Sequence, residues 1–218
     1  MKNFAVIFDM DGTMVDNTPY HYQTWQVMFK KYGMGELSPH TYYSEFSGVP
    51  VLDTVQRIFS DRDNDGMHQL VKEKEAIYQD LYTPHAVAVK GLVGFLEDLK
   101  QSGIKIAIAS SASIHDIDFI LERIRVREYF DVIIDGSQVN KGKPNPDIFL
   151  KAAEHLQTLP QHCAVIEDSI AGIKAGNAAG MKVIGITTGN SAEKLQPSAL
   201  VIDDFTELSV EKLTELFN

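Results

Sequence analysis

Helical and strand-like patterns alternate along the chain from residue 91 to residue 202, and no other feature restricts the fold as strongly. The helical patterns place apolar residues three or four positions apart, as in Leu92, Phe95 and Leu99. Between them lie short apolar runs typical of buried strands, at residues 104–109, 132–134, 164–166, 183–186 and 200–202. Because parallel strands of one sheet are joined by right-handed helical crossovers, this order predicts a doubly wound α/β fold.

One further strand precedes this region and ends in acidic residues. The apolar run of residues 4–8 is followed directly by Asp9, Met10, Asp11 and Gly12. In an open α/β sheet, ligands bind at the carboxyl ends of the strands. Two aspartates this close repel each other unless a cation or a shared substrate compensates their charge. The alternative is an acidic turn without function.

Residues 16–86 show helical patterns and no convincing strand. Thr18 resembles an N-cap because a proline follows it, and further helices are expected after Pro50 and over about residues 67–82. The sequence therefore predicts an all-helical insert, residues 16–86, in a core formed by residues 1–15 and 87–218.

Residues 61–66 match the opening of a calcium-binding EF-hand loop. The twelfth position of such a loop carries a bidentate glutamate, whereas this chain has Lys72 there. The segment is therefore predicted to be a solvated acidic turn between two helices.

The composition is that of an ordinary globular chain. Of the 218 residues, 44% are apolar and 23% are charged. The formal net charge of −10 argues against a nucleic acid or an anionic membrane as partner. No apolar run reaches membrane-spanning length and no signal peptide precedes the first strand, so a cytoplasmic protein is expected, and a monomer. Cys163 is expected to be a buried, inert thiol.

Polar residues stand at the ends of four predicted strands, which should share one edge of the sheet. They are Asp9 and Asp11 after the first strand, Ser110 and Ser111 after the second, Lys143 in the loop after the third, and Glu167 and Asp168 after the fourth. This set is typical of phosphoryl transfer, in which carboxylates hold Mg²⁺ while a lysine and a hydroxyl hold the phosphoryl group. One carboxylate can then act as the nucleophile.

Each of these residues has a structural interpretation when it is considered alone. Ser110 can cap a strand end, and Lys143 can be a solvated loop residue. Glu167 and Asp168 can cap the helix that follows them. Their joint occurrence at one sheet edge favours the functional interpretation.

The set resembles the four motifs of the haloacid dehalogenase superfamily. The residues that carry the resemblance are Asp9-Met10-Asp11-Gly12-Thr13, Ser110, Lys143-Pro144 and Glu167-Asp168. The likeness covers nearly the whole chain and includes an insert at the position of the superfamily's helical cap. Residues 143–149 and 166–173 are similar to the β-phosphoglucomutase-like branch of phosphatases and mutases. The resemblance implies a Rossmann-like core with a cap domain.

The resemblance also implies catalytic roles. Asp9 would attack phosphorus and become the aspartyl phosphate, and Asp11 would act as general acid and then as general base. Dehalogenases of the superfamily lack an acid at the position of Asp11, and phosphonatases carry a small residue there. The motif therefore favours phosphate-ester chemistry.

The remaining motif residues would hold the metal and the phosphoryl group. The resemblance implies Mg²⁺ bound by Asp9, by the backbone carbonyl of Asp11, by Asp168 and, directly or through water, by Glu167. Ser110 and Lys143 would hold the transferring phosphoryl group, and Ser111 is a candidate substrate contact.

His21, Glu45 and Lys74 are the candidate substrate residues of the predicted cap. In the β-phosphoglucomutase-like branch, a histidine followed by a tryptophan, here His21 and Trp25, faces the acid/base aspartate. A core or a solvated histidine is the alternative. Lys74 would supply a charge, although Lys72 could equally be the inward-facing lysine. Glu45 would repel a second phosphate or recognise hydroxyl groups.

One position of the predicted cap departs from the related mutase. In β-phosphoglucomutase the segment similar to residues 48–51 carries an arginine, aligned with Val51, that binds the second phosphate. Valine cannot make this charge-assisted contact.

The expected function is therefore a Mg²⁺-dependent phosphohydrolase of a small phosphorylated metabolite, first of all a sugar phosphate. The alternatives are a β-phosphoglucomutase, an inorganic pyrophosphatase and a non-catalytic binding protein. The intact motif set argues against the last of these.

Overall fold

The computed structural model describes residues 4–47 and 49–218, so Gly48 of the aligned cap segment lies outside the described residues. The chain forms two compact units. The larger unit comprises Met1–Asp16 and Val87–Asn218, and the smaller unit comprises Asn17–Ala86. Each unit has an apolar core of its own.

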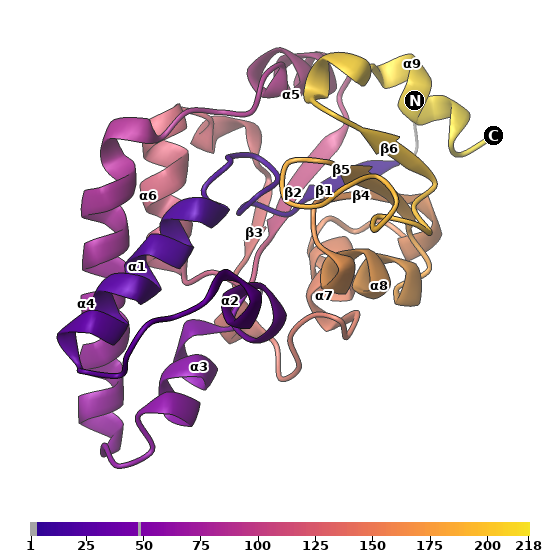
Figure 1. The fold of residues 1–218 in the computed structure, drawn as a ribbon. Helices are drawn as coiled ribbons and strands as arrows, with labels where there is room; N and C mark the ends of the chain where they lie inside the picture. Colours follow the sequence, from indigo (N-terminus) through magenta and orange to yellow (C-terminus); the bar gives the residue numbers. More distant parts are fainter. Residues whose placement is uncertain (1–3, 48) are drawn as a thin grey trace. The chain divides into compact units, whose positions relative to one another are not determined.

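The larger unit contains a parallel sheet with the strand order β3-β2-β1-β4-β5-β6 (Figure 1). Its strands are β1 (Ala5–Phe8), β2 (Lys105–Ala109), β3 (Val132–Ile134), β4 (Cys163–Glu167), β5 (Lys182–Ile186) and β6 (Leu200–Ile202). Ile7 of β1 pairs with Ala107 of β2 on one side and with Val165 of β4 on the other. The predicted doubly wound α/β fold is confirmed, and each described strand matches a predicted apolar run to within one residue.

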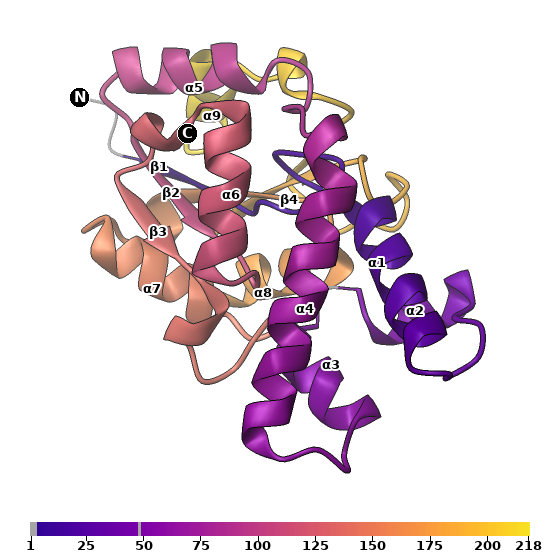
Figure 2. The same cartoon turned by 90° about the vertical axis from the view of Figure 1, so that its left-hand side faces the viewer.

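Helices cover both faces of this sheet. Figures 1 and 2 show α5 (Leu92–Gln101) and α9 (Val210–Glu215) on one face, and α7 (Asp147–His155) and α8 (Ile170–Ala178) on the other. A further helix, α6 (Ile114–Ile124), connects β2 to β3, and the Oγ of Ser113 caps it by accepting from the N–H of Asp116 at 3.2 Å. The sheet is thus the middle layer of the larger unit.

Successive residues of β1 enter different cores because side chains alternate across a strand. Ile7 belongs to a buried cluster that includes Phe149 of α7. Phe8 packs on the other face against Phe95 and Phe205, with ring centroids 6.1 and 5.9 Å away. β1 is therefore buried on both faces, which explains its unbroken apolar sequence.

The smaller unit is helical. It contains α1 (Thr18–Lys31), α2 (Pro39–Glu45), α3 (Val51–Ile58), α4 (Asn64–Tyr82) and a 3₁₀ turn (Thr83–His85). Side chains from all four α-helices form its core, among them Trp25, Tyr42, Val55 and Leu70. The three predicted helices correspond to α1, α3 and α4.

Three local features differ from the sequence-based expectation or refine it. Helix α2 was not predicted, although the Oγ of Ser38 marks its start by accepting from the N–H of Thr41 at 3.0 Å. The N-cap of α1 is Asn17, and Thr18 is the first helical residue. In the acidic turn, the Oδ1 of Asp63 caps α4.

Among the described helices, none combines the length and apolar character needed to cross a bilayer.

Candidate active site

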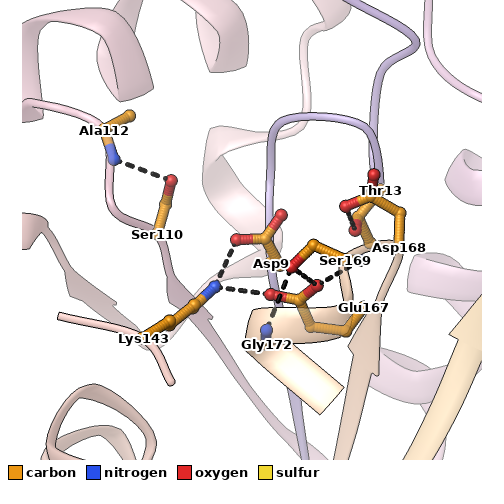
Figure 3. Close-up of polar contacts among 9 residues, drawn as sticks. All are labelled: Asp9, Thr13, Ser110, Ala112, Lys143, Glu167, Asp168, Ser169 and Gly172. Carbon is orange, nitrogen blue, oxygen red and sulfur yellow. Dashed lines mark hydrogen bonds and ion pairs between the residues drawn. The ribbon is translucent and has the colours of Figure 1, made fainter. Parts of the chain in front are cut away.

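The adjacent strands β1 and β4 bring three carboxylates together at the carboxyl edge of the sheet (Figure 3). Asp9 follows β1, and its N–H donates to the carbonyl oxygen of Ile166 at 3.0 Å. Glu167 ends β4 and Asp168 comes next. One oxygen from each of these carboxylates lies within 4.8 Å of the others, and all three residues are buried. Buried carboxylates this close require a cationic partner.

Lys143 reaches these carboxylates from the loop after β3. Its Nζ lies 2.5 Å from Oδ1 of Asp9 and 2.7 Å from Oε1 of Glu167. Nζ also lies 4.9 Å from the ring centroid of Phe149. Burial lowers the pKa of Lys143, but Asp9 and Glu167 outweigh this effect and raise the pKa above its ordinary value. The lysine is therefore protonated at neutral pH.

One lysine does not compensate three buried carboxylates. Burial raises the pKa of Asp9 from 3.8 to about 7, against the opposing effect of Lys143. Burial and the charge of Glu167 also raise the pKa of Asp168. A hard divalent cation in contact with the carboxylate oxygens would keep these groups ionised, and the donor set fits such an ion.

The loop after β1 carries the half-buried Asp11 in a tight turn. Gly12 has a φ of 78°, and its N–H donates to the carbonyl oxygen of Val15 at 2.8 Å. A side chain at position 12 would overlap the carboxylate of Asp168. Oγ1 of Thr13 donates to Oδ1 of Asp168 at 3.4 Å. The loop therefore packs directly on a carboxylate that follows β4.

Ser169 fixes the orientation of Glu167. Its N–H and its hydroxyl donate to Oε2 of Glu167 at 2.8 and 2.9 Å, and its Oγ accepts from the N–H of Gly172 at 3.0 Å. Ser169, rather than Glu167 or Asp168, is the N-cap of α8. Ser169 was not among the predicted site residues, although a serine directly before an apolar helical pattern is a common N-cap signal.

Ser110 stands at the end of β2, next to β1 in the sheet. It is 1% exposed, its N–H donates to the carbonyl oxygen of Ile134 at 3.0 Å, and its Oγ accepts from the N–H of Ala112 at 3.1 Å. Figure 3 shows Ser110 and Lys143 on one side of Asp9, with Asp168 on the other. Ser111, beside Ser110, is half-buried.

Two of the predicted cap residues contact each other within the smaller unit. Nζ of Lys74 lies 3.2 Å from Nδ1 of His21, and Lys74 is 1% exposed whereas Lys72 is exposed. His21 stacks on Tyr78 with ring centroids 4.1 Å apart, and the Asn17 amide donates to the Tyr78 hydroxyl at 2.6 Å. Lys74 is therefore the buried one of the two lysines, and His21 belongs to a half-buried polar network.

Glu45 lies in a different setting of the smaller unit. Its carboxylate is 3.8 Å from Nη1 of Arg57, and its carbonyl oxygen accepts from Nη2 of Arg57 at 3.0 Å. The same guanidinium lies over the ring of Phe46, 5.1 Å from the centroid. Val51, at the start of α3, packs against the apolar core.

Comparison with known proteins gives consistent matches over almost the whole chain. A family model described as haloacid dehalogenase-like hydrolase matches residues 6–186. The chain is 32% identical to the β-phosphoglucomutase of Bacillus subtilis over 221 residues, which is 97% of this chain and 94% of the relative. It is 31% identical to the phosphorylated carbohydrates phosphatase of Thermotoga maritima over 188 residues, 83% of each chain. The crystal structure of β-phosphoglucomutase from Clostridium difficile gives a TM-score of 0.85 at 29% identity, covering 100% of this chain and 98% of that one.

Proposed function

Because the chain belongs to the haloacid dehalogenase-like hydrolase family, we propose that it is a Mg²⁺-dependent phosphohydrolase of a small phosphorylated metabolite, first of all a sugar phosphate. The observation that carries this proposal is the buried carboxylate of Asp9, ion-paired with Lys143 and grouped with Glu167 and Asp168. A sugar phosphate is favoured because the similar proteins include a phosphatase of phosphorylated carbohydrates and a mutase of phosphoglucose.

The proposed metal ligands are Asp9, Asp168 and the backbone carbonyl of Asp11. Glu167 differs from them, since Lys143 donates to its Oε1 and Ser169 donates to its Oε2. These contacts favour a role for Glu167 through a bound water. When bound, Mg²⁺ would neutralise negative charge on the carboxylates and on the phosphoryl oxygens.

The residues of the larger unit then carry out two successive displacements at phosphorus. A carboxylate oxygen of Asp9 forms a bond to phosphorus while the ester bond breaks, and the departing oxygen takes a proton from the Asp11 carboxyl group. In the second step a water oxygen attacks phosphorus and gives its proton to Asp11. The bond from phosphorus to Asp9 breaks, which releases phosphate and restores the Asp9 carboxylate.

Lys143 and Ser110 would hold the transferring phosphoryl group during both steps. The Lys143 ammonium already lies against the nucleophile, so it would reduce the repulsion between the Asp9 carboxylate and an incoming phosphate. The buried Ser110 hydroxyl is placed at the neighbouring strand end, where it can donate to a phosphoryl oxygen.

A β-phosphoglucomutase is the second candidate, because one of the similar proteins has that activity. A mutase must hold a second phosphate group as well as the first. The partly buried Val51 packs against the core of the smaller unit, and Arg57 of the same helix contacts Glu45 and Phe46. These contacts favour hydrolysis over mutase action.

One assay separates the two candidates. The protein is supplied with Mg²⁺ and β-glucose 1-phosphate, primed with a trace of glucose 1,6-bisphosphate, and both glucose 6-phosphate and free phosphate are followed. We expect free phosphate without glucose 6-phosphate, and a panel of sugar phosphates and pyrophosphate then identifies the substrate class. Rapid formation of glucose 6-phosphate without free phosphate would make the protein a mutase.

The nucleophile is tested in the same assay. Asp9→Asn should lower turnover by roughly a thousandfold or more, because the amide oxygen is a far weaker nucleophile. Asp16→Asn, at an exposed position of the same loop, is the matched control and should retain turnover. An Asp9→Asn variant with most of its activity would refute the assignment.

A further inference from the structure

The geometry points to a positioning role for residues 188–190, the loop after β5: we propose that this Thr-Gly-Asn segment, here called the clasp, holds Asp168 and the loop after β1 in their metal-binding arrangement. The inference rests on the proposed function, since it concerns the proposed metal ligands. The clasp lies outside the four motifs that the sequence indicates.

Two side chains of the clasp bind the backbone of the two loops that carry metal ligands. The hydroxyl of Thr188 donates to the carbonyl oxygen of Gly12, which directly follows Asp11. The side-chain amide of Asn190 donates to the carbonyl oxygen of Asp168 at 3.1 Å. The first contact joins residues that are 176 positions apart in the sequence, and the second joins residues that are 22 positions apart. The clasp therefore connects the ends of β1 and β4.

Gly189, between these two residues, packs against the side chain of Asp168. A Cβ at position 189 would overlap Oδ2 of Asp168, just as a Cβ at Gly12 would overlap it from the other loop. Thr13 donates to the other oxygen, Oδ1. The carboxylate of Asp168 is thus enclosed by Gly12, Thr13 and Gly189.

Asp168 is therefore held by different contacts from those that hold Asp9 and Glu167. Lys143 binds Asp9 and Glu167, and Ser169 also binds Glu167. Asp168 is positioned instead by the packing and hydrogen bonds of the two loops. Partners that orient a metal ligand in this way commonly contribute about tenfold or more to metal affinity.

The test is calorimetric titration of Mg²⁺ and of Mn²⁺ into the metal-free full-length protein. We expect Thr188→Val to weaken binding by about tenfold, because the isosteric side chain loses its hydroxyl. Thr188→Ser should bind like the wild type. Thr187→Val is the matched control: the Thr187 hydroxyl donates to Oδ1 of Asp203 at 2.7 Å, and Asp203 is not among the proposed metal ligands, so metal affinity should not change.

Gly189→Ala provides a second test of the clasp, in which no hydrogen-bonding group is removed. Its methyl group would displace the carboxylate of Asp168, and we expect a weakening of at least the same size. Circular dichroism and the melting temperature in EDTA establish that each variant is folded, and a variant that does not fold is replaced by the other.

The outcomes distinguish this inference from the proposed function. A wild type that binds Mg²⁺, with Thr188→Val and Gly189→Ala binding equally well, would overturn the clasp and leave the proposed function intact. A wild type that binds neither ion would overturn both. Equal weakening by Thr187→Val would show a general effect of the loop and would also overturn the clasp.

Discussion

The carboxyl group of Asp9 couples the stability of the metal-free protein to pH. Burial raises its pKa from 3.8 to about 7, so the folded state keeps a proton that the unfolded chain has released. The resulting stabilisation is complete below about pH 4 and is lost as the pH rises through about 7. Asp9→Asn stays neutral and avoids this loss. We expect the difference in free energy of unfolding between Asp9→Asn and the wild type to shift in favour of the variant by a few kcal/mol from pH 5 to pH 8. This size follows from about 1.4 kcal/mol for each unit by which the pKa of Asp9 is raised.

Urea unfolding in EDTA at the two pH values measures this difference. Asp98→Asn, at an exposed position of α5, is the control: it retains Asp9, so its free energy of unfolding should follow that of the wild type at both pH values. Equal effects of Asp9→Asn at pH 5 and pH 8 would contradict a raised pKa for Asp9.

At the residue scale, the sequence indicated the charged members of the site better than the residues that orient them. Asp9, Lys143 and Glu167 could be predicted as neighbours because all three follow or end strands that share one edge of the sheet, and their joint occurrence there is informative. Ser169 and Thr188 could not, because serine and threonine are ordinary in caps and loops. Their contacts depend on which loops meet, and that is decided by the assembled sheet.

At the scale of single elements, helices α5 and α8 each contain a glycine, and the two glycines differ in the space available for a side chain. A methyl group added at Gly94 of α5 meets no atom within 4 Å, whereas one added at Gly176 of α8 would lie 2.7 Å from Cγ2 of Val183. Gly94→Ala should therefore raise the free energy of unfolding by about 0.5–1 kcal/mol through helix propensity. Gly176→Ala should lower it by about 1–2 kcal/mol, because overpacking exceeds that gain.

Chemical denaturation of the two variants beside the wild type measures both effects, and each variant serves as the control for the other. Stabilisation by Gly176→Ala would show that Val183 moves aside without cost. Destabilisation by Gly94→Ala would mean that the exposed face of α5 needs a glycine for a reason other than packing.

The strands were predictable from sequence, whereas the short helices were not. Strands such as β1 and β4 are buried on both faces, which produces unbroken apolar runs that mark their limits. Helices α2 and α9 have seven and six residues, so fewer than two turns are present to show a period of 3.6. The start of α1 was misplaced by one residue because Thr18 before a proline resembles an N-cap as closely as Asn17 does.

At the scale of the whole molecule, the alternation of helices and strands was sufficient to predict the order of the layers. Right-handed crossovers then bring the ends of β1, β2 and β4 to one edge, which assembles the site from distant parts of the sequence. Substrate choice is a different matter, since it depends on individual side chains rather than on the order of helices and strands. The fold class and the reaction class were therefore accessible from the sequence, and the substrate was not.

The final prediction concerns the stability of the larger unit as a whole. All three carboxylates of the site belong to that unit, where burial and neighbouring charges raise the pKa values of Asp9 and Asp168. A cation that binds only the folded state at a hundred times its dissociation constant adds about 2.7 kcal/mol of stability. For a chain of this size, that corresponds to a rise in melting temperature of about 5–10 °C.

Differential scanning calorimetry with Mg²⁺ or with EDTA should show this rise in the wild type, and Asp168→Asn should lose most of it. NaCl at equal ionic strength is the control for general screening. An equal rise with NaCl, or an undiminished rise in Asp168→Asn, would show that Mg²⁺ stabilises the chain elsewhere than at this group of carboxylates.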